Sequence, residues 1–177
     1  VKGLDPARPI TAGCNEPNSG NHLFRSGVLD VIGYNYHNKD IPNVPANFPD
    51  KPFIITESNS ALMTRGYYRM PSDRMFIWPE RWDKSFADST FACSSYENCH
   101  VPWGNTHEES LKLVRDNDFI SGQYVWTGFD YIGEPTPYGW PARSSYFGIV
   151  DLAGFPKDVY YLYQSEWTDK QMLHLFP

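Results

Sequence analysis

The chain has 177 residues, 41% hydrophobic and 20% charged, which is typical of one folded domain with a sizeable apolar core. Its formal charge of −6 and scattered basic residues offer no stripe that could neutralise phosphates, so we expect no nucleic-acid partner. No apolar stretch approaches the roughly 18 residues that span a bilayer, so we expect no membrane partner either.

The first three residues, Val1 to Gly3, resemble the end of a helix, and we expect the chain to begin inside a larger fold. Four short apolar runs then predict strands, at residues 9–14, 29–36, 53–57 and 119–126. These runs are continuous rather than alternating, as expected for strands that are covered on both faces.

Two helices are predicted. Thr106 to Glu109 has the form of a capping box, in which Thr106 accepts from the backbone and Glu109 reaches back, and the helix stops at Asp116. A second helix is predicted over residues 157–164, after a Gly-Phe-Pro turn.

Two long connections follow predicted strands. Residues 58–105 far exceed the usual length of about 2–6 residues, and loops of that size are mostly functional or disordered. The aromatic residues of this segment favour an ordered insertion that forms one wall of a site. They are Trp78, Trp82, Phe86 and Phe91. Residues 130–146, rich in Pro, Gly and Tyr, predict a second wall on the same face.

Alternating strands and crossovers predict an α/β fold with a parallel sheet, in which each strand leads into a loop at its carboxyl end. A (β/α)₈ TIM-type barrel uses about 250 residues, so four units in this chain resemble half of one. An open, flavodoxin-like sheet is the competing arrangement. No glycine-rich phosphate loop follows any predicted strand, which weakens the nucleotide-binding version.

Glu57 ends the third predicted strand among Ser and Asn residues, where a carboxylate could attack an anomeric carbon. A lone acid there would more often cap a turn. However, Tyr36 ends the preceding strand, where its hydroxyl could donate to Glu57, and Trp126 ends the following one, where its ring could floor a sugar subsite. Each residue separately is more often structural, but their shared position favours a sugar site.

Three motifs resemble glycoside hydrolase family 2, and most closely its β-galactosidases. They are Ile55-Thr56-Glu57-Ser58-Asn59-Ser60-Ala61, Asp30-Val31-Ile32-Gly33-Tyr34-Asn35-Tyr36, and the quite specific run from Val125 to Pro137. Ser144 to Asp151, with the segments 154–157 and 161–165, extends the match. It covers nearly the whole chain and is weakest over residues 67–99.

The resemblance implies that residues 1–177 are the C-terminal half of a catalytic barrel domain, approximately strands five to eight. It implies a retaining hydrolysis of terminal β-D-galactosides, with Glu57 as nucleophile and Tyr36 as the residue that supports it. Trp126 matches the sugar platform, Trp103 matches a wall aromatic, and a cis peptide is expected after Trp126. The metal ligands of related galactosidases lie mostly outside the matched region, so we expect no metal and no cofactor.

A retaining glycosidase needs a second carboxyl group about 5–5.5 Å from the nucleophile. Glu16 follows an Asn, as the family acid/base does, but only one predicted strand lies between it and Glu57, where two are needed. Glu134 and Asp130 lie in the second wall loop and are ambiguous. We therefore expect the acid/base upstream of Val1, and the isolated chain to be inactive.

Several alternatives stay open. Another family 2 activity, such as β-glucuronidase or β-mannosidase, is one, and a non-catalytic carbohydrate-binding fragment is another. A fragment with no function of its own is a third. Open sheet edges of a half barrel also predict a homodimer. Of three cysteines, Cys93 and Cys99 are spaced for a local disulfide, and no zinc-type spacing occurs.

Overall fold

The computed structural model describes residues 1–71, 73–81, 83, 84, 90 and 92–177. The chain forms two compact units. The first comprises residues 1–58 and 108–125, and the second comprises residues 59–107 and 126–177. The chain therefore crosses from one unit to the other three times.

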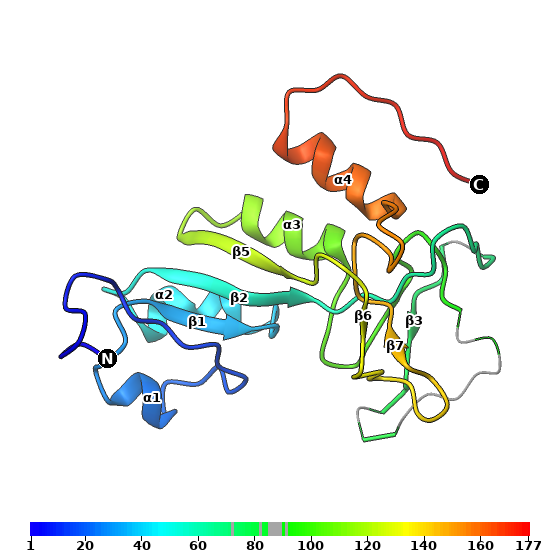
Figure 1. Ribbon diagram of the computed structural model, residues 1–177. Coiled ribbons are helices and arrows are strands. Elements are labelled where there is room, and N and C mark those ends of the chain that lie inside the picture. Colours follow the sequence, from blue (N-terminus) through cyan, green and yellow to red (C-terminus); the bar gives the residue numbers. More distant parts are fainter. Residues whose placement is uncertain (72, 82, 85–89, 91) are drawn as a thin grey trace. The chain divides into compact units, whose positions relative to one another are not determined.

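The first unit is built on a three-stranded sheet of β1 (Ile32–Asn35), β2 (Phe53–Asn59) and β5 (Ile120–Trp126), in the order β1-β2-β5. β1 and β2 are parallel, and the arrow of β5 points the same way in Figure 1. Ile32 lies opposite Phe53, but the register shifts after Tyr34, so Asn35 lies opposite Glu57. The sheet is thus parallel, and its carboxyl edge carries an irregularity beside Glu57.

Short helices cover this sheet and share one apolar core with it. They are α1 (His22–Arg25), the 3₁₀ turn η1 (Ile41–Asn43), α2 (Val44–Asn47) and α3 (His107–Arg115). The buried side chains are Ile32, Tyr34, Ile41, Val44, Phe53, Ile55 and Ile120, with Phe24 of α1 and Leu113 and Val114 of α3 packed against them. Burial of these side chains is the main force holding the unit together.

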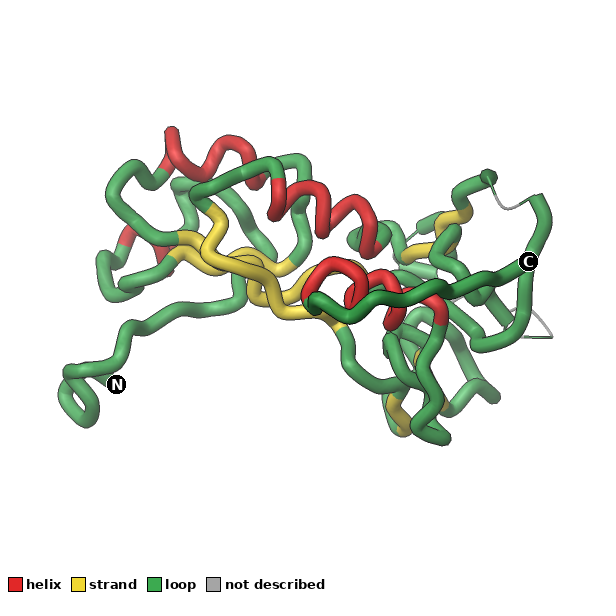
Figure 2. The backbone as a smooth tube through the Cα atoms, turned by 90° about the horizontal axis from the view of Figure 1, so that it is seen from above, coloured by secondary structure: helices red, strands yellow, loops and turns green. Residues whose placement is uncertain are grey.

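The second unit consists mostly of loops and turns, drawn green in Figure 2. Two small pairs of strands brace it: β3 (Phe76–Ile77) with β4 (Cys99–His100) in parallel, and β6 (Tyr131–Ile132) with β7 (Ser144–Ser145) antiparallel. The helix α4 (Asp158–Trp167) follows. The apolar core of the second unit comprises Leu62, Cys93, Cys99, Val101, Tyr138 and Phe147. Among partly buried rings against this core are Trp78 of the first predicted wall and Tyr131 of the second.

The predicted α/β class with a parallel sheet is confirmed, and three of the four predicted strands correspond to β1, β2 and β5. Both predicted helices are present, as α3 and α4. Within the described residues the main sheet holds three strands, so the half barrel stays a prediction. Trp82, Phe86 and Phe91 lie outside the described residues.

The prediction of a strand over residues 9–14 was wrong. This segment is extended but makes only one isolated parallel bridge, from Cys14 to Tyr34. Pro9 has no N–H to donate, and the carbonyl of Ile10 accepts from the N–H groups of both Asp30 and Val31 instead of continuing a ladder. The segment therefore lies beside β1 without forming a fourth strand.

The three cysteines, Cys14, Cys93 and Cys99, are free and buried, so the local disulfide that their spacing permits is not formed. In the described part of the chain, no helix is both long and apolar enough to cross a bilayer.

Candidate active site

Glu57 and Tyr36 meet at the carboxyl edge of the sheet in the first unit. The Tyr36 hydroxyl donates to Glu57 Oε2 over 3.0 Å, and the Tyr36 N–H donates to the Glu57 carbonyl over 2.7 Å. Tyr36 is only 8% exposed, whereas Glu57 is partly accessible. The Tyr36 hydroxyl therefore holds one oxygen of the Glu57 carboxylate.

The local backbone around this pair is constrained. Tyr36 and His37 have φ of 58° and 59°, a region that non-glycine residues rarely adopt and that occurs most often where function demands it. On the neighbouring strand, the Thr56 hydroxyl donates to Asn35 Oδ1 over 2.7 Å. That bond joins β1 and β2 where their register shifts. Asn35 and Thr56 directly precede Tyr36 and Glu57, so the bond holds the backbone that carries both side chains.

One residue after Glu57, β2 is hydrogen-bonded through a side chain to the neighbouring strand β5. The Ser58 hydroxyl donates to the Tyr124 carbonyl over 3.1 Å. The next two residues, Asn59 and Ser60, again have positive φ, of 76° and 55°. In the second unit the Ser60 N–H donates to the Trp126 carbonyl over 3.3 Å. One pair of positive-φ residues therefore directly follows β1, and another stands at the end of β2, the strand that carries the candidate nucleophile.

Trp126 and Trp103 lie in the second unit, where both pack against its apolar core as partly buried rings. The Trp126 ring meets Tyr131 edge-on, with centroids 6.0 Å apart and an interplanar angle of 77°. The Trp126–Thr127 peptide is cis, as expected from the family resemblance. Both tryptophans keep part of their surface accessible, which a sugar platform requires.

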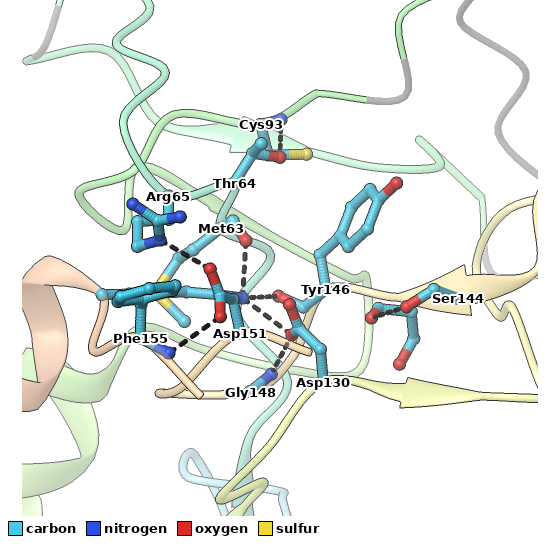
Figure 3. Close-up of polar contacts among 12 residues, drawn as sticks. Met63, Thr64, Arg65, Cys93, Asp130, Ser144, Tyr146, Gly148, Asp151 and Phe155 are labelled. Carbon is cyan, nitrogen blue, oxygen red and sulfur yellow. Dashed lines mark hydrogen bonds and ion pairs between the residues drawn. The ribbon is translucent and has the colours of Figure 1, made fainter. Parts of the chain in front are cut away.

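The segment after Trp126 is held by a buried ion pair (Figure 3). The side chain of Lys157 is fully buried, and its Nζ donates to Asp130 Oδ1 over 2.7 Å and to the carbonyls of Met63 and Tyr146 over 2.7 and 3.3 Å. Figure 3 labels the partner residues Met63, Asp130 and Tyr146. Asp130 Oδ1 also accepts from the Gly148 N–H over 2.8 Å. One ammonium group therefore ties together three segments that are distant in the sequence.

Burial works against both charges of this pair. It raises the pKa of Asp130 and lowers the pKa of Lys157, while the opposite charge of each partner counteracts the effect on the other. Neither charge would be tolerated in this interior without its partner.

A second buried network surrounds His107 at the start of α3. His107 Nδ1 lies 2.7 Å from the Tyr163 hydroxyl, which accepts from Asn59 Nδ2 over 3.2 Å. Burial lowers the pKa of His107 to about 3, so the imidazole is neutral, and its Nδ1 shares one hydrogen bond with this hydroxyl. The backbone N–H of His107 donates to Glu97 Oε2. This network fixes Asn59, two residues after Glu57.

The four residues predicted from the sequence divide between the two units. Tyr36 and Glu57 are joined directly in the first, and Trp126 and Trp103 share a core in the second. Glu16 lies exposed in a turn, where its carbonyl accepts from the N–H of Asn18, in agreement with its interpretation as a loop residue.

The two ambiguous acids of the second wall differ in their surroundings. Glu134 is exposed, whereas Asp130 is committed to Lys157. Sequence reasoning missed the roles of Lys157 and His107, although Lys157 begins a predicted helix and His107 lies within the capping motif. The described residues include no cluster of three or more His, Cys, Asp or Glu side chains that could hold a metal ion.

Comparison with known proteins places this arrangement among the glycosidases. The chain is 31% identical to a β-glycosidase of known structure from Bacteroides vulgatus, with a TM-score of 0.78, covering 99% of this chain and 24% of that one. A β-galacturonidase of glycoside hydrolase family 2 from Eisenbergiella tayi shares the fold at 21% identity and a TM-score of 0.64, covering 99% of this chain and 30% of that one. No family model matches the chain.

A curated relative is far more similar. Over all 177 residues, the chain is 98% identical to 21% of the length of Beta-galactosidase BoGH2A from Bacteroides ovatus. The resemblance to glycoside hydrolase family 2 is therefore confirmed. The chain spans about a fifth of the length of the curated relatives that it matches.

Proposed function

We propose that this chain supplies the nucleophile of a retaining β-galactosidase site, with Glu57 as that nucleophile. The observation that carries the proposal is the 3.0 Å hydrogen bond from the Tyr36 hydroxyl to Glu57 Oε2 at the carboxyl edge of a parallel sheet. In parallel α/β folds, catalytic groups collect at that edge. The 98% identity to a β-galactosidase supports the substrate class.

In the proposed reaction, the free carboxylate oxygen of Glu57 attacks the anomeric carbon of a terminal β-galactoside. The bond to the aglycone breaks, and its oxygen takes a proton from a second carboxyl group. Water then hydrolyses the galactosyl ester and regenerates Glu57. The Tyr36 hydroxyl orients Glu57, because it donates to Glu57 Oε2 over 3.0 Å.

Trp126 and Trp103 are assigned to the sugar-binding part of the site. Flat aromatic faces pack well on the C–H faces of a pyranose. The Trp126 carbonyl is bound by the Ser60 N–H, and Ser60 lies three residues after Glu57 in the sequence.

The wider architecture that we propose is strands five to eight of a (β/α)₈ catalytic barrel, with the acid/base contributed from outside these residues. Glu16, Glu134 and Asp130 are poor candidates for that group, because the first two are exposed and the third is paired with Lys157. The homodimer expected from open sheet edges stays a prediction.

Covalent labelling tests the nucleophile. 2,4-Dinitrophenyl 2-deoxy-2-fluoro-β-D-galactoside has a leaving group that needs no acid, so the first step can proceed without the second carboxyl group. We expect intact-mass spectrometry to show one fluorogalactosyl group per chain, with peptide mapping to Glu57. The Glu57→Gln variant should remain unlabelled. Labelling of another carboxylate, or none in a folded protein, would overturn the assignment.

Turnover of an unactivated substrate tests whether the acid/base carboxyl group lies outside this chain. Methyl β-D-galactoside has a poor leaving group whose departure depends on protonation, and general acid catalysis contributes about 10²–10⁴-fold. We therefore expect the 177-residue chain to release no measurable galactose from it in a coupled assay. Efficient turnover would show that the acid/base lies within this chain after all.

A further inference from the structure

The second unit contains a cavity of about 220 Å³ that does not involve any of the candidate catalytic residues. Its lining combines aromatic rings with polar groups: Tyr68, Arg69, Ser94, Tyr96, Asn98 and Phe176. The segment 67–99 is also where the family resemblance is weakest. The cavity therefore lies in a part of the chain that the proposed reaction leaves without a role.

Asn98 is the informative residue of this lining. Only 6% of it is exposed, yet within the described residues neither its Oδ1 nor its Nδ2 has a hydrogen-bond partner. Buried polar groups are nearly always satisfied, and one that is not calls for an explanation such as a bound molecule. Its backbone is firmly held, because its N–H donates to the Tyr96 carbonyl over 2.7 Å and its carbonyl accepts from the Phe76 N–H over 2.8 Å. The amide is thus held ready for a ligand.

The aromatic side chains give the cavity an apolar wall. The rings of Tyr96 and Phe176 are stacked on each other, with centroids 4.7 Å apart and an interplanar angle of 16°. Tyr68 lies nearly parallel to Phe176, at 4° and 6.4 Å. The stack holds these rings in place, and the ring surface that remains on the cavity side favours a ligand that is partly apolar.

Arg69 supplies fixed donors. Its guanidinium lies over the rings of Phe76 and Trp78, 4.5 and 4.7 Å from their centroids, which holds the planar group in place. Among the residues that the structure describes, no carboxylate forms an ion pair with Arg69. Asp73 also lines the cavity, so its overall charge is balanced rather than strongly positive.

Together these groups define the ligand class. An apolar molecule would leave the Asn98 amide unsatisfied, and a strong anion would be opposed by Asp73. A neutral pyranose fits both requirements, because its C–H face packs on a ring while its hydroxyls both donate to and accept from an amide. We propose that the cavity lined by Tyr68, Arg69, Tyr96, Asn98 and Phe176 binds a neutral pyranosyl unit, as a carbohydrate site additional to the proposed galactosidase site.

Ligand titration monitored by ¹H–¹⁵N NMR tests this site on the folded 177-residue chain. The probes are methyl β-D-galactopyranoside, methyl β-D-glucopyranoside and methyl β-D-glucuronide. For a ligand this small we expect a Kd of about 1 mM for at least one neutral sugar, with shifts at the Asn98 side chain. Because the readout here is the Asn98 side chain rather than covalent labelling at Glu57, a failed nucleophile assignment and a failed sugar site give different results.

The Asn98→Leu variant supplies the decisive comparison. Removal of an unsatisfied buried amide should leave Tm unchanged or raise it, while weakening sugar binding at least about tenfold. Four results would overturn the proposal: no neutral sugar binds, binding survives in Asn98→Leu, only the charged glucuronide binds, or the Tm of Asn98→Leu is lower, which would show that the amide serves the fold.

Discussion

Replacing Lys157 by methionine is expected to destabilise the second unit by about 3–5 kcal/mol. The ammonium group is completely buried and donates to Asp130 and to the carbonyls of Met63 and Tyr146. Methionine fills a similar volume but leaves the Asp130 carboxylate buried without a counter-charge. Urea unfolding monitored by tryptophan fluorescence should show the loss as a lower midpoint with an unchanged slope.

A double substitution separates the effect of the unpaired Asp130 charge from the effect of replacing the Lys157 side chain. Asp130→Asn keeps an oxygen that can accept from the Gly148 N–H but removes the negative charge. The Lys157→Met, Asp130→Asn protein should therefore recover much of the stability lost in Lys157→Met alone, since the two residues are in direct contact and their effects do not add.

Arg65→Met is the matched control for this experiment. It breaks the ion pair between Arg65 and Asp151, which spans 2.5 Å but has 46% of the arginine side chain exposed. Pairs of that kind contribute about 0–1 kcal/mol. If Lys157→Met were no more damaging than Arg65→Met, the Lys157 pair could not be an organising element of the second unit.

The ion pair also shows where sequence reasoning reached its limit. The strands β1, β2 and β5 were predicted because continuous apolar runs are a local signal, and α3 was predicted from its capping residues. The partners of Lys157 are 27 and 94 residues away in Asp130 and Met63, and no local pattern records such distances. A lysine after Gly-Phe-Pro is, by sequence alone, a surface residue at a helix start.

For the candidate site too, local sequence patterns predicted some features, and others depend on tertiary structure. Tyr36 and Glu57 could be paired from sequence because both are expected at the carboxyl ends of neighbouring parallel strands. In the structure Tyr36 directly follows β1 and Glu57 lies two residues before the end of β2, where the register brings them together. The strand predicted over residues 9–14 was wrong because apolar character does not supply the donors of a ladder, and Pro9 has none. The unsatisfied amide of Asn98 had no sequence signal, since burial of one side chain depends on the whole tertiary structure.

Stability of the second unit is also expected to fall as the pH drops below about 6.5, because of His107. Burial, aided by the positive charge of Lys157, lowers the pKa of His107 to about 3 in the folded protein. In the unfolded chain a histidine has a pKa of about 6.5, so between these values only the unfolded state takes up the proton. Stability from this residue is therefore complete above pH 6.5 and decreases toward pH 3.

The expected size of the effect is large for a single side chain. Each pKa unit of difference corresponds to about 1.4 kcal/mol, so the full loss below pH 3 is about 5 kcal/mol, with about 2 kcal/mol lost between pH 6.5 and 4.5. Urea midpoints measured across this interval should follow that slope. Carboxylates contribute to acid unfolding too, and a histidine variant is needed to isolate the effect.

His107→Gln provides that comparison, because glutamine cannot titrate but can still accept from the Tyr163 hydroxyl. This variant should be less stable than the native chain at neutral pH, yet its stability should change much less between pH 6.5 and 4.5. Replacing the exposed His22 of α1 by glutamine should leave the native curve unaltered. Equal slopes for the native chain and His107→Gln would mean that His107 is not the group whose protonation opposes folding.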